Sequence, residues 1–200
     1  MTDTRAMLGL LVPTDPAWVA AVERDLPAML SDHAHCELKA AQSALSLVGK
    51  YGGEHPEIVG PLLALAHEET EHFAEVERRL VAAGGRLGEP HTDDYVGALR
   101  KVSRRDGMSS PVLLDRLLVA SLVEARSCER FQLLARHLQD EGLRAFYAEL
   151  MASEAKHHRL FAGLAERLFG VDHARARLAE LASREAAIAG RLPLGPTVHG

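Results

Sequence analysis

A glutamate followed three positions later by a histidine occurs twice in this chain, each time within an otherwise apolar segment. The first pair is Glu69 and His72, in EETEH, and the second is Glu154 and His157, in SEAKHH. Residues three apart in an α-helix lie on one face about one turn apart, so the two side chains of a pair can reach the same point. A single pair of this kind is typical of a solvated helix face. It is therefore the occurrence of two such pairs, rather than either pair alone, that indicates a shared site.

One glutamate upstream of each pair completes the repeat. Glu37 stands 32 residues before Glu69, and Glu124 stands 30 residues before Glu154, each in a helical segment of its own. Four helices then supply four carboxylates and two imidazoles, the ligand set of ferritin-like di-iron and di-manganese proteins. Such ligands suit iron or manganese, whereas structural zinc usually takes thiolates. The predicted metal ligands are Glu37, Glu69, His72, Glu124, Glu154 and His157, with Glu68 as the alternative if the register of the first pair shifts by one.

Length and composition are those of one soluble globular domain. The 200 residues carry a net charge of −5, with 47% hydrophobic and 26% charged residues. No apolar run approaches the roughly 18 residues of a membrane helix, and the N-terminus does not read as a signal peptide. Only Cys36 and Cys128 are present, without metal-type spacing, which fits a reducing cytoplasm. We expect a cytoplasmic protein with one domain over residues 1–190 and a flexible tail over 191–200.

Glycine and proline divide the chain into helical segments. We expect helices over about 16–26, 28–50, 56–83, 111–138, 143–169 and 172–189. The connection over 86–110, with a short helix at 95–105, is too long for a hairpin. Its length lets the second helix pair lie antiparallel beside the first. The predicted fold class is all-α: a ferritin-like four-helix bundle with a long crossover between the two helix pairs and extra terminal helices.

The surroundings of the predicted ligands admit two interpretations. The small residues near Glu37 and Glu124 leave room for dioxygen or a substrate, or else allow close helix packing. His33 lies one turn before Glu37 and is either a neighbour of the metal ligand or, more commonly for such a residue, a partly exposed histidine. We expect most other histidines at the surface, such as His35, His67 and His158.

Six segments carry a resemblance to a known family: DHAHCELKAA (32–41), ALSLVGKY (44–51), HEETEHF (67–73), LRKVSRR (99–105), VEARSCERF (123–131) and SEAKHH (153–158). They resemble the MiaE-type tRNA hydroxylases over roughly residues 10–170. EARSCERF, together with the segment at 32–41, is much more specific than the Glu-x-x-His pairs. Leu38 departs from the family pattern, which more often has a charged or polar residue there.

The resemblance implies a reaction. Members of this family are oxygen-dependent, non-haem di-iron monooxygenases that hydroxylate the isopentenyl side chain of a hypermodified adenosine beside the tRNA anticodon. It implies two iron ions, dioxygen as co-substrate and electrons from a ferredoxin-like protein. It also implies bridging roles for Glu69 and Glu154 and terminal ones for Glu37 and Glu124, which makes these four the catalytic carboxylates.

A basic segment offers contacts for an RNA substrate. Residues 99–116 carry a local excess of three positive charges although the whole chain is acidic, and phosphate contacts require lysine and arginine. Contacts to the anticodon-loop phosphates are predicted for Arg100, Lys101, Arg104 and Arg105. The alternative is a solvated amphipathic helix. Arg126 and Arg130, on a ligand helix, are expected to pair with nearby carboxylates instead.

Three other functions share parts of this pattern. A ferritin-like protein that oxidises or stores iron has the same ligand set, and so has a di-iron or di-manganese oxidase of a small molecule. A non-catalytic helical bundle that binds partners needs no metal at all.

Overall fold

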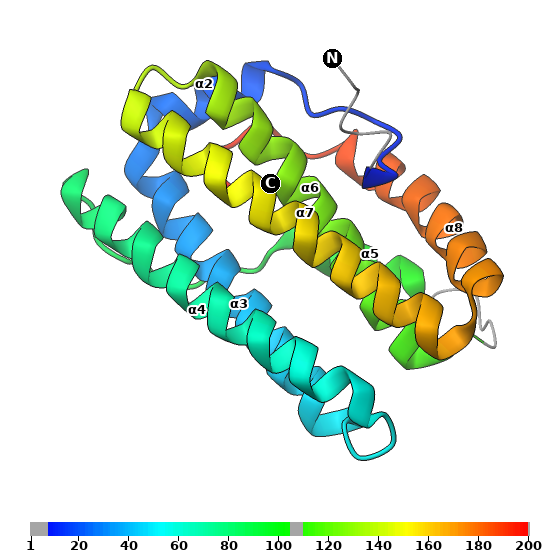
Figure 1. Ribbon diagram of the computed structural model, residues 1–200. Coiled ribbons are helices and arrows are strands. Elements are labelled where there is room, and N and C mark those ends of the chain that lie inside the picture. The colour runs from blue at the N-terminus through cyan, green and yellow to red at the C-terminus, as the bar shows by residue number, and fades with distance from the viewer. Residues whose placement is uncertain (1–7, 105–109, 200) are drawn as a thin grey trace. The chain divides into compact units, whose positions relative to one another are not determined.

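The computed structural model describes residues 8–104 and 110–199, and in these ranges the chain is helical, without strands (Figure 1). The elements in chain order are α2 (Ala17–Arg24), α3 (Leu26–Tyr51), the 3-10 turn η1 (Pro56–Ile58), α4 (Val59–Ala82), α5 (Asp94–Ser103), α6 (Val112–His137), α7 (Glu141–Phe169) and α8 (Val171–Ala189). The predicted all-α class is confirmed. The helices begin and end within a few residues of the predicted bounds.

Aspartate side chains begin three of these helices. The Asp25 carboxylate accepts a hydrogen bond from Ala28 N at 3.1 Å, and Pro27 stands in the first turn of α3, where its missing N–H breaks no helical bond. Asp93 and Asp140 cap α5 and α7 in the same way. Gly170 separates α7 from α8 with a φ of +86°, a backbone conformation that residues with a Cβ rarely adopt.

The chain divides into two compact units, and one of them, the α3–α4 unit, contains Ala21–Thr92 and Gly195–Val198. The short connection through η1 makes α3 and α4 a helical hairpin, and the two helices lie side by side. The buried apolar residues of the two helices include Leu30, Ala34, Leu47, Leu62, Leu65, Val76 and Leu80.

The chain after α4 returns along α3 and is fastened to it. His35 Nε2 lies 2.9 Å from Gly88 O, and Gly88 N donates to Ser31 Oγ at 2.9 Å. Lys39 Nζ donates to His91 O at 2.8 Å. The first part of the crossover is therefore ordered by side chains of α3 rather than by secondary structure of its own.

The second unit, the α6–α7 unit, contains the described parts of Met1–Ala20 and Asp93–Leu194, together with His199. Its centre is the hairpin of α6 and α7, and α5 and α8 pack against it. Its buried residues include Tyr95, Leu114, Leu117, Leu118, Phe131, Tyr147, Leu164 and Leu181.

The last described residues are hydrogen-bonded in both units. Val198 N donates to the Asp32 carboxylate at 2.5 Å in the α3–α4 unit. His199 in the α6–α7 unit lies 3.0 Å from Ser127 Oγ and stacks on Tyr95. The single domain over 1–190 and the mobility of residues 191–200 stay predictions. None of the described helices is both long and apolar enough to cross a membrane.

Candidate metal centre

The α3–α4 unit brings three predicted ligands together: Glu37 from α3, and Glu69 and His72 from α4. His72 Nδ1 lies 3.2 Å from Glu69 Oε2 and 4.0 Å from Glu37 Oε2. One ligand atom from each of the three residues lies within 4.8 Å of the others. We call these residues the α3–α4 ligand group. Both carboxylates are buried, Glu69 completely.

Glu68, the alternative to Glu69, lies on the other side of His72. Its Oε1 is 4.0 Å from His72 Nε2, and its side chain is 39% exposed. Glu69 rather than Glu68 therefore lies on the buried side of α4, in the register that the spacing predicts.

His33 is fully buried, so the expectation of a partly exposed histidine was wrong. Its Nε2 lies 2.6 Å from Glu37 Oε1, one helical turn away. The four-residue spacing to Glu37 was the available signal. The spacing alone does not distinguish a buried histidine from one that faces solvent, and the second case is more common.

The α6–α7 unit holds the other three predicted ligands, all of them buried: Glu124 on α6, and Glu154 and His157 on α7. His157 Nδ1 lies 3.8 Å from Glu154 Oε2. One ligand atom of Glu124 lies within 4.8 Å of one of His157. We call these residues the α6–α7 ligand group. It repeats the first group in residue types and in helix order.

A reciprocal contact aligns α6 with α7 beside this group. Ser121 Oγ donates to His158 O at 3.0 Å, and His158 Nδ1 lies 2.9 Å from Ser121 O. Burial lowers the pKa of His158, and the Ser121 backbone bond only partly opposes this, so the imidazole is neutral at pH 7. Ser121 precedes Glu124 by one turn, and His158 follows His157. The contact therefore fixes how Glu124 on α6 and His157 on α7 are aligned along the two helix axes.

Two of the three histidines that we expected at the surface are buried, and that expectation was wrong for them. His35 binds the Gly88 carbonyl and His158 binds Ser121, partners 53 and 37 residues away in the chain. His67 is exposed, as expected.

The donor chemistry of both ligand groups fits iron. Each group holds two buried carboxylates and one imidazole, and buried carboxylates close together cannot all remain ionised without a compensating cation. Oxygen and imidazole donors without thiolate favour iron or manganese over structural zinc. A divalent metal ion satisfies the charge, the donor types and the burial together.

The predicted phosphate contacts divide into three cases. Arg100 and Lys101 are exposed on α5. Arg104 is bound to the buried Asp115 carboxylate at 2.9 Å, and Arg105 lies outside the described residues.

Arginines of α8 hold the end of α5. Arg177 donates to Ser103 O at 2.8 Å and to Asp115 Oδ1 at 2.9 Å, while Arg184 donates to Val102 O at 2.5 Å. Burial alone lowers the pKa of Arg177, but its bonds to Asp115 and Glu180 outweigh this and raise it. The exposed basic residues of α5 therefore stand on a firmly held helix.

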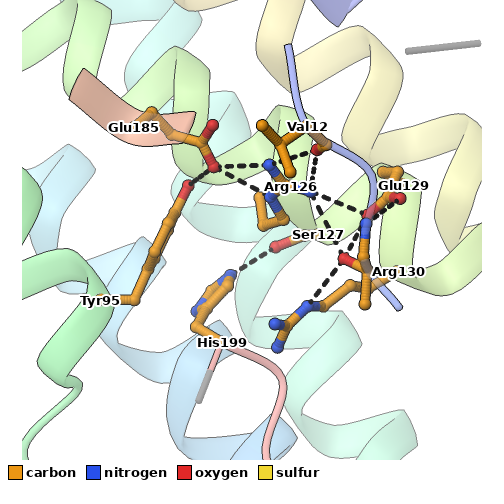
Figure 2. Close-up of polar contacts among 9 residues, drawn as sticks. Val12, Tyr95, Arg126, Ser127, Glu129, Arg130, Glu185 and His199 are labelled. Carbon is orange, nitrogen blue, oxygen red and sulfur yellow. Dashed lines mark hydrogen bonds and ion pairs between the residues drawn. The ribbon is translucent and has the colours of Figure 1, made fainter. Parts of the chain in front are cut away.

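The EARSCERF segment of α6 forms a buried polar network, shown in Figure 2. Arg126 donates to Glu185 on α8 at 2.7 Å and to Glu129 at 3.1 Å, which confirms the expected pairing of Arg126 with carboxylates. It also donates to Val12 O at 3.1 Å. Tyr95 OH donates to the same Glu185 oxygen at 3.0 Å. Burial and then the Glu185 charge raise the Tyr95 pKa, so the phenol keeps its proton.

The same segment binds the chain that precedes α2. Thr14 N and Oγ1 both donate to the Glu129 carboxylate, at 2.9 and 2.6 Å. The Arg130 guanidinium lies over the Trp18 ring, 5.0 Å from its centroid. Burial, and then the charge of Arg126, lower the pKa of Arg130 to about 10. The motif therefore joins α6 to the chain around residues 12–18 and to α8.

The comparisons with known proteins agree with one another. A family model described as tRNA-(MS[2]IO[6]A)-hydroxylase (MiaE) matches residues 3–200. Two curated relatives are both named tRNA 2-(methylsulfanyl)-N(6)-isopentenyladenosine(37) hydroxylase. The one from Pseudomonas putida is 40% identical, over 84% of this chain and 80% of the relative. The one from Salmonella typhimurium is 31% identical, over 80% of this chain and 76% of the relative.

A solved structure extends the likeness to the fold. Protein 43 from Synechococcus, with aldehyde deformylating oxygenase activity, has a TM-score of 0.87 and 36% identity, and the match covers 96% of this chain and 95% of that one. This confirms the predicted ferritin-like fold. With the family match over nearly its whole length and the two curated relatives, the chain belongs to the MiaE family of tRNA hydroxylases.

Proposed function

We propose that this protein hydroxylates the isopentenyl side chain of a modified adenosine next to the anticodon of tRNA. The observation that carries the proposal is the 40% identity, over 84% of this chain, to a relative named for that reaction. The two ligand groups support it because hydroxylation of a C–H bond needs a redox-active metal, and their donors suit iron. A tRNA substrate places the protein in the cytoplasm.

We assign two iron ions to the metal centre of this proposal. The two ligand groups would hold them together, and Glu69, Glu154, Glu37 and Glu124 are the carboxylates assigned to them. Four carboxylates offset the four positive charges of two ferrous ions, so the loaded core is neutral. Iron supplies the activation of dioxygen, and the burial of the ligands keeps bulk water away from them.

The proposed reaction balances with an external reductant. One oxygen atom of dioxygen enters an allylic C–H bond to give an alcohol. The other oxygen atom takes up two electrons and two protons and leaves as water. We assign the electrons to a ferredoxin-like protein. The tRNA phosphates are bound by Arg100 and Lys101 on α5, which are exposed, with Arg104 and Arg105 further along the same segment.

Nucleoside analysis of tRNA from a strain lacking this gene tests the reaction. We expect the hydroxylated prenyl-adenosine to disappear, its unhydroxylated precursor to accumulate, and the gene on a plasmid to reverse both changes. An unchanged nucleoside profile would contradict the proposed substrate.

A matched pair of variants tests the metal ligands. Glu69→Ala removes a buried predicted ligand, whereas Glu71→Ala removes an exposed carboxylate two residues away on the same helix. We expect the first to lower the affinity for iron and the hydroxylation of an anticodon stem-loop by at least about 10–100-fold, the loss that outer partners of a metal ligand already cause. Glu71→Ala should keep iron binding and hydroxylation at the wild-type level. Equal behaviour of the two variants would count against Glu69 as a metal ligand.

The solved relative favours a second candidate, an oxygenase whose substrate is an aldehyde, because it is 36% identical over nearly the whole chain and has that activity. Iron-loaded protein with a reductant, given a long-chain aldehyde or an anticodon stem-loop in parallel, separates the two functions. We expect turnover of the stem-loop alone.

A further inference from the structure

His33 makes the shortest described contact of an imidazole to any predicted ligand. Its Nε2 lies 2.6 Å from Glu37 Oε1, and the imidazole is fully buried. An ionised carboxylate only accepts hydrogen bonds, so the imidazole donates its Nε2–H. A hydrogen bond to a charged acceptor in a buried place is stronger than one between neutral groups.

This bond distinguishes the two oxygens of Glu37. Oε1 faces His33, while Oε2 lies 4.0 Å from His72 Nδ1. The same His72 nitrogen is 3.2 Å from Glu69 Oε2. Oε2 is therefore the Glu37 oxygen directed at the other donor atoms of the α3–α4 ligand group.

The position that corresponds to His33 in the α6–α7 ligand group does not hold a hydrogen-bond donor. The residue four positions before Glu37 is His33, whereas the residue four positions before Glu124 is Ala120, whose side chain cannot donate a hydrogen bond. A hydrogen bond from four positions upstream is therefore available to Glu37 and not to Glu124.

We propose that His33 is a positioning residue that holds Glu37 so that only Oε2 is presented to a metal ion. This inference rests on the metal centre of the proposed function. The donated hydrogen bond restricts the Glu37 rotamer before the metal arrives and occupies the oxygen that would otherwise bind as well.

Three variants test the proposal in the full-length protein. His33→Leu fills the buried space without a donor, and His33→Gln restores an N–H near the position of Nε2. His35→Leu is the matched control, because His35 is also buried on α3 but binds the Gly88 carbonyl instead of a ligand. Fe²⁺ and, separately, Co²⁺ are titrated anaerobically against a competing chelator, and the absorption spectrum of bound Co²⁺ is recorded.

We expect His33→Leu to weaken the binding of one of the two ions by about 10–100-fold and to change the Co²⁺ spectrum. His33→Gln should return both to near the wild-type values, and His35→Leu should leave them unchanged. Wild-type affinity and spectrum in His33→Leu would overturn the inference, as would an equal loss in His35→Leu. Fewer than two ions bound by the wild type would instead overturn the metal centre itself, and the inference with it.

The wild-type protein gives a test that needs no variant, should His33→Leu fail to fold. Nitrogen-15 NMR of labelled histidines identifies which ring nitrogen carries the proton. We expect His33 to carry a proton at Nε2 in both the metal-free and the metal-loaded protein. A His33 protonated only at Nδ1 would overturn the proposal, because such a ring cannot donate to Glu37 Oε1.

Discussion

Cys128 follows Glu124 by one turn of α6, and its thiol is buried with Sγ 3.3 Å from Met151 O. Burial raises its pKa to about 11, although the charge of Arg159 acts in the opposite direction. Because alkylating reagents react with the thiolate, Cys128 is unreactive at neutral pH and becomes reactive only as the pH approaches about 11.

We therefore expect iodoacetamide at pH 8 to label Cys36, which is half-buried, well before Cys128, as read by mass spectrometry of tryptic peptides. In urea the two should label at similar rates. Similar rates in the folded protein would show that the α6–α7 unit opens readily around Cys128.

Glu185 is a single residue on which the buried network depends. It is completely buried, and it accepts hydrogen bonds from Arg126 and Tyr95. Burial alone would lower the pKa of Arg126, yet the charge of Glu185 is the largest of the contributions that raise it instead. Loss of this carboxylate leaves the guanidinium poorly compensated in the interior.

Glu185→Gln should therefore lower the free energy of unfolding by about 3–5 kcal/mol, measured by urea denaturation. The control is Glu166→Gln, which breaks the exposed pair with Arg175 and should cost about 0–1 kcal/mol. A similar effect of the two changes would mean that the buried pair contributes no more than a surface pair.

At this scale the sequence predicts which of the proposed ligands lie together better than it predicts their neighbours. The regular spacing brings Glu69 and His72 together because both lie on one helix, within one turn. It does not show that His35 and His158 are buried, because their partners, Gly88 and Ser121, are far away in the chain. Burial of a polar side chain depends on which distant atom satisfies it, and a single sequence does not contain that pairing.

At the scale of elements, α5 is the piece of the crossover that carries Arg100 and Lys101, the residues proposed to bind tRNA. Its predicted existence follows from the apolar spacing of Tyr95 and Leu99, both of which are buried. Its attachment to α8 does not follow from the sequence, because Arg177 and Arg184 reach the last residues of α5 from 74 and 82 residues further along. The helix bounds, in contrast, are local. Proline, glycine and the capping aspartates set them.

The structure also selects the residues that test RNA binding. Arg104 is bound to Asp115, so its replacement by glutamate would place two carboxylates together and disturb the fold. Arg100→Glu with Lys101→Glu should instead weaken tRNA binding and reduce the slope of log K against log salt by about 2, the value for two lost phosphate contacts. Filter binding across a salt series measures both quantities.

Iron content should stay at the wild-type value in this double variant. The control, Arg24→Glu with Arg78→Glu, makes the same change in charge at two other exposed arginines. Equal loss of affinity in both double variants would mean that overall charge, rather than α5, determines binding.

At the scale of the whole molecule, metal ions bound at the proposed centre should stabilise the folded chain against unfolding. A metal that binds only the folded chain stabilises it by about 2.7 kcal/mol at a free concentration one hundred times its dissociation constant. We expect anaerobic Fe²⁺ to raise the thermal midpoint and a chelator to reverse the change, as followed by circular dichroism. The shift should be smaller in Glu69→Ala, and a shift of wild-type size there would contradict the ligand assignment.

The network around Arg126 bears on how relatives of this protein are grouped. The most distinctive stretch of the chain, EARSCERF, contributes Glu124 to the ligands, but Arg126, Glu129 and Arg130 bind Glu185, Thr14 and Trp18. Those contacts serve a scaffold and touch none of the predicted ligands. A search for proteins with this stretch would therefore collect a shared architecture, and enzymes with quite different substrates would be expected among the results.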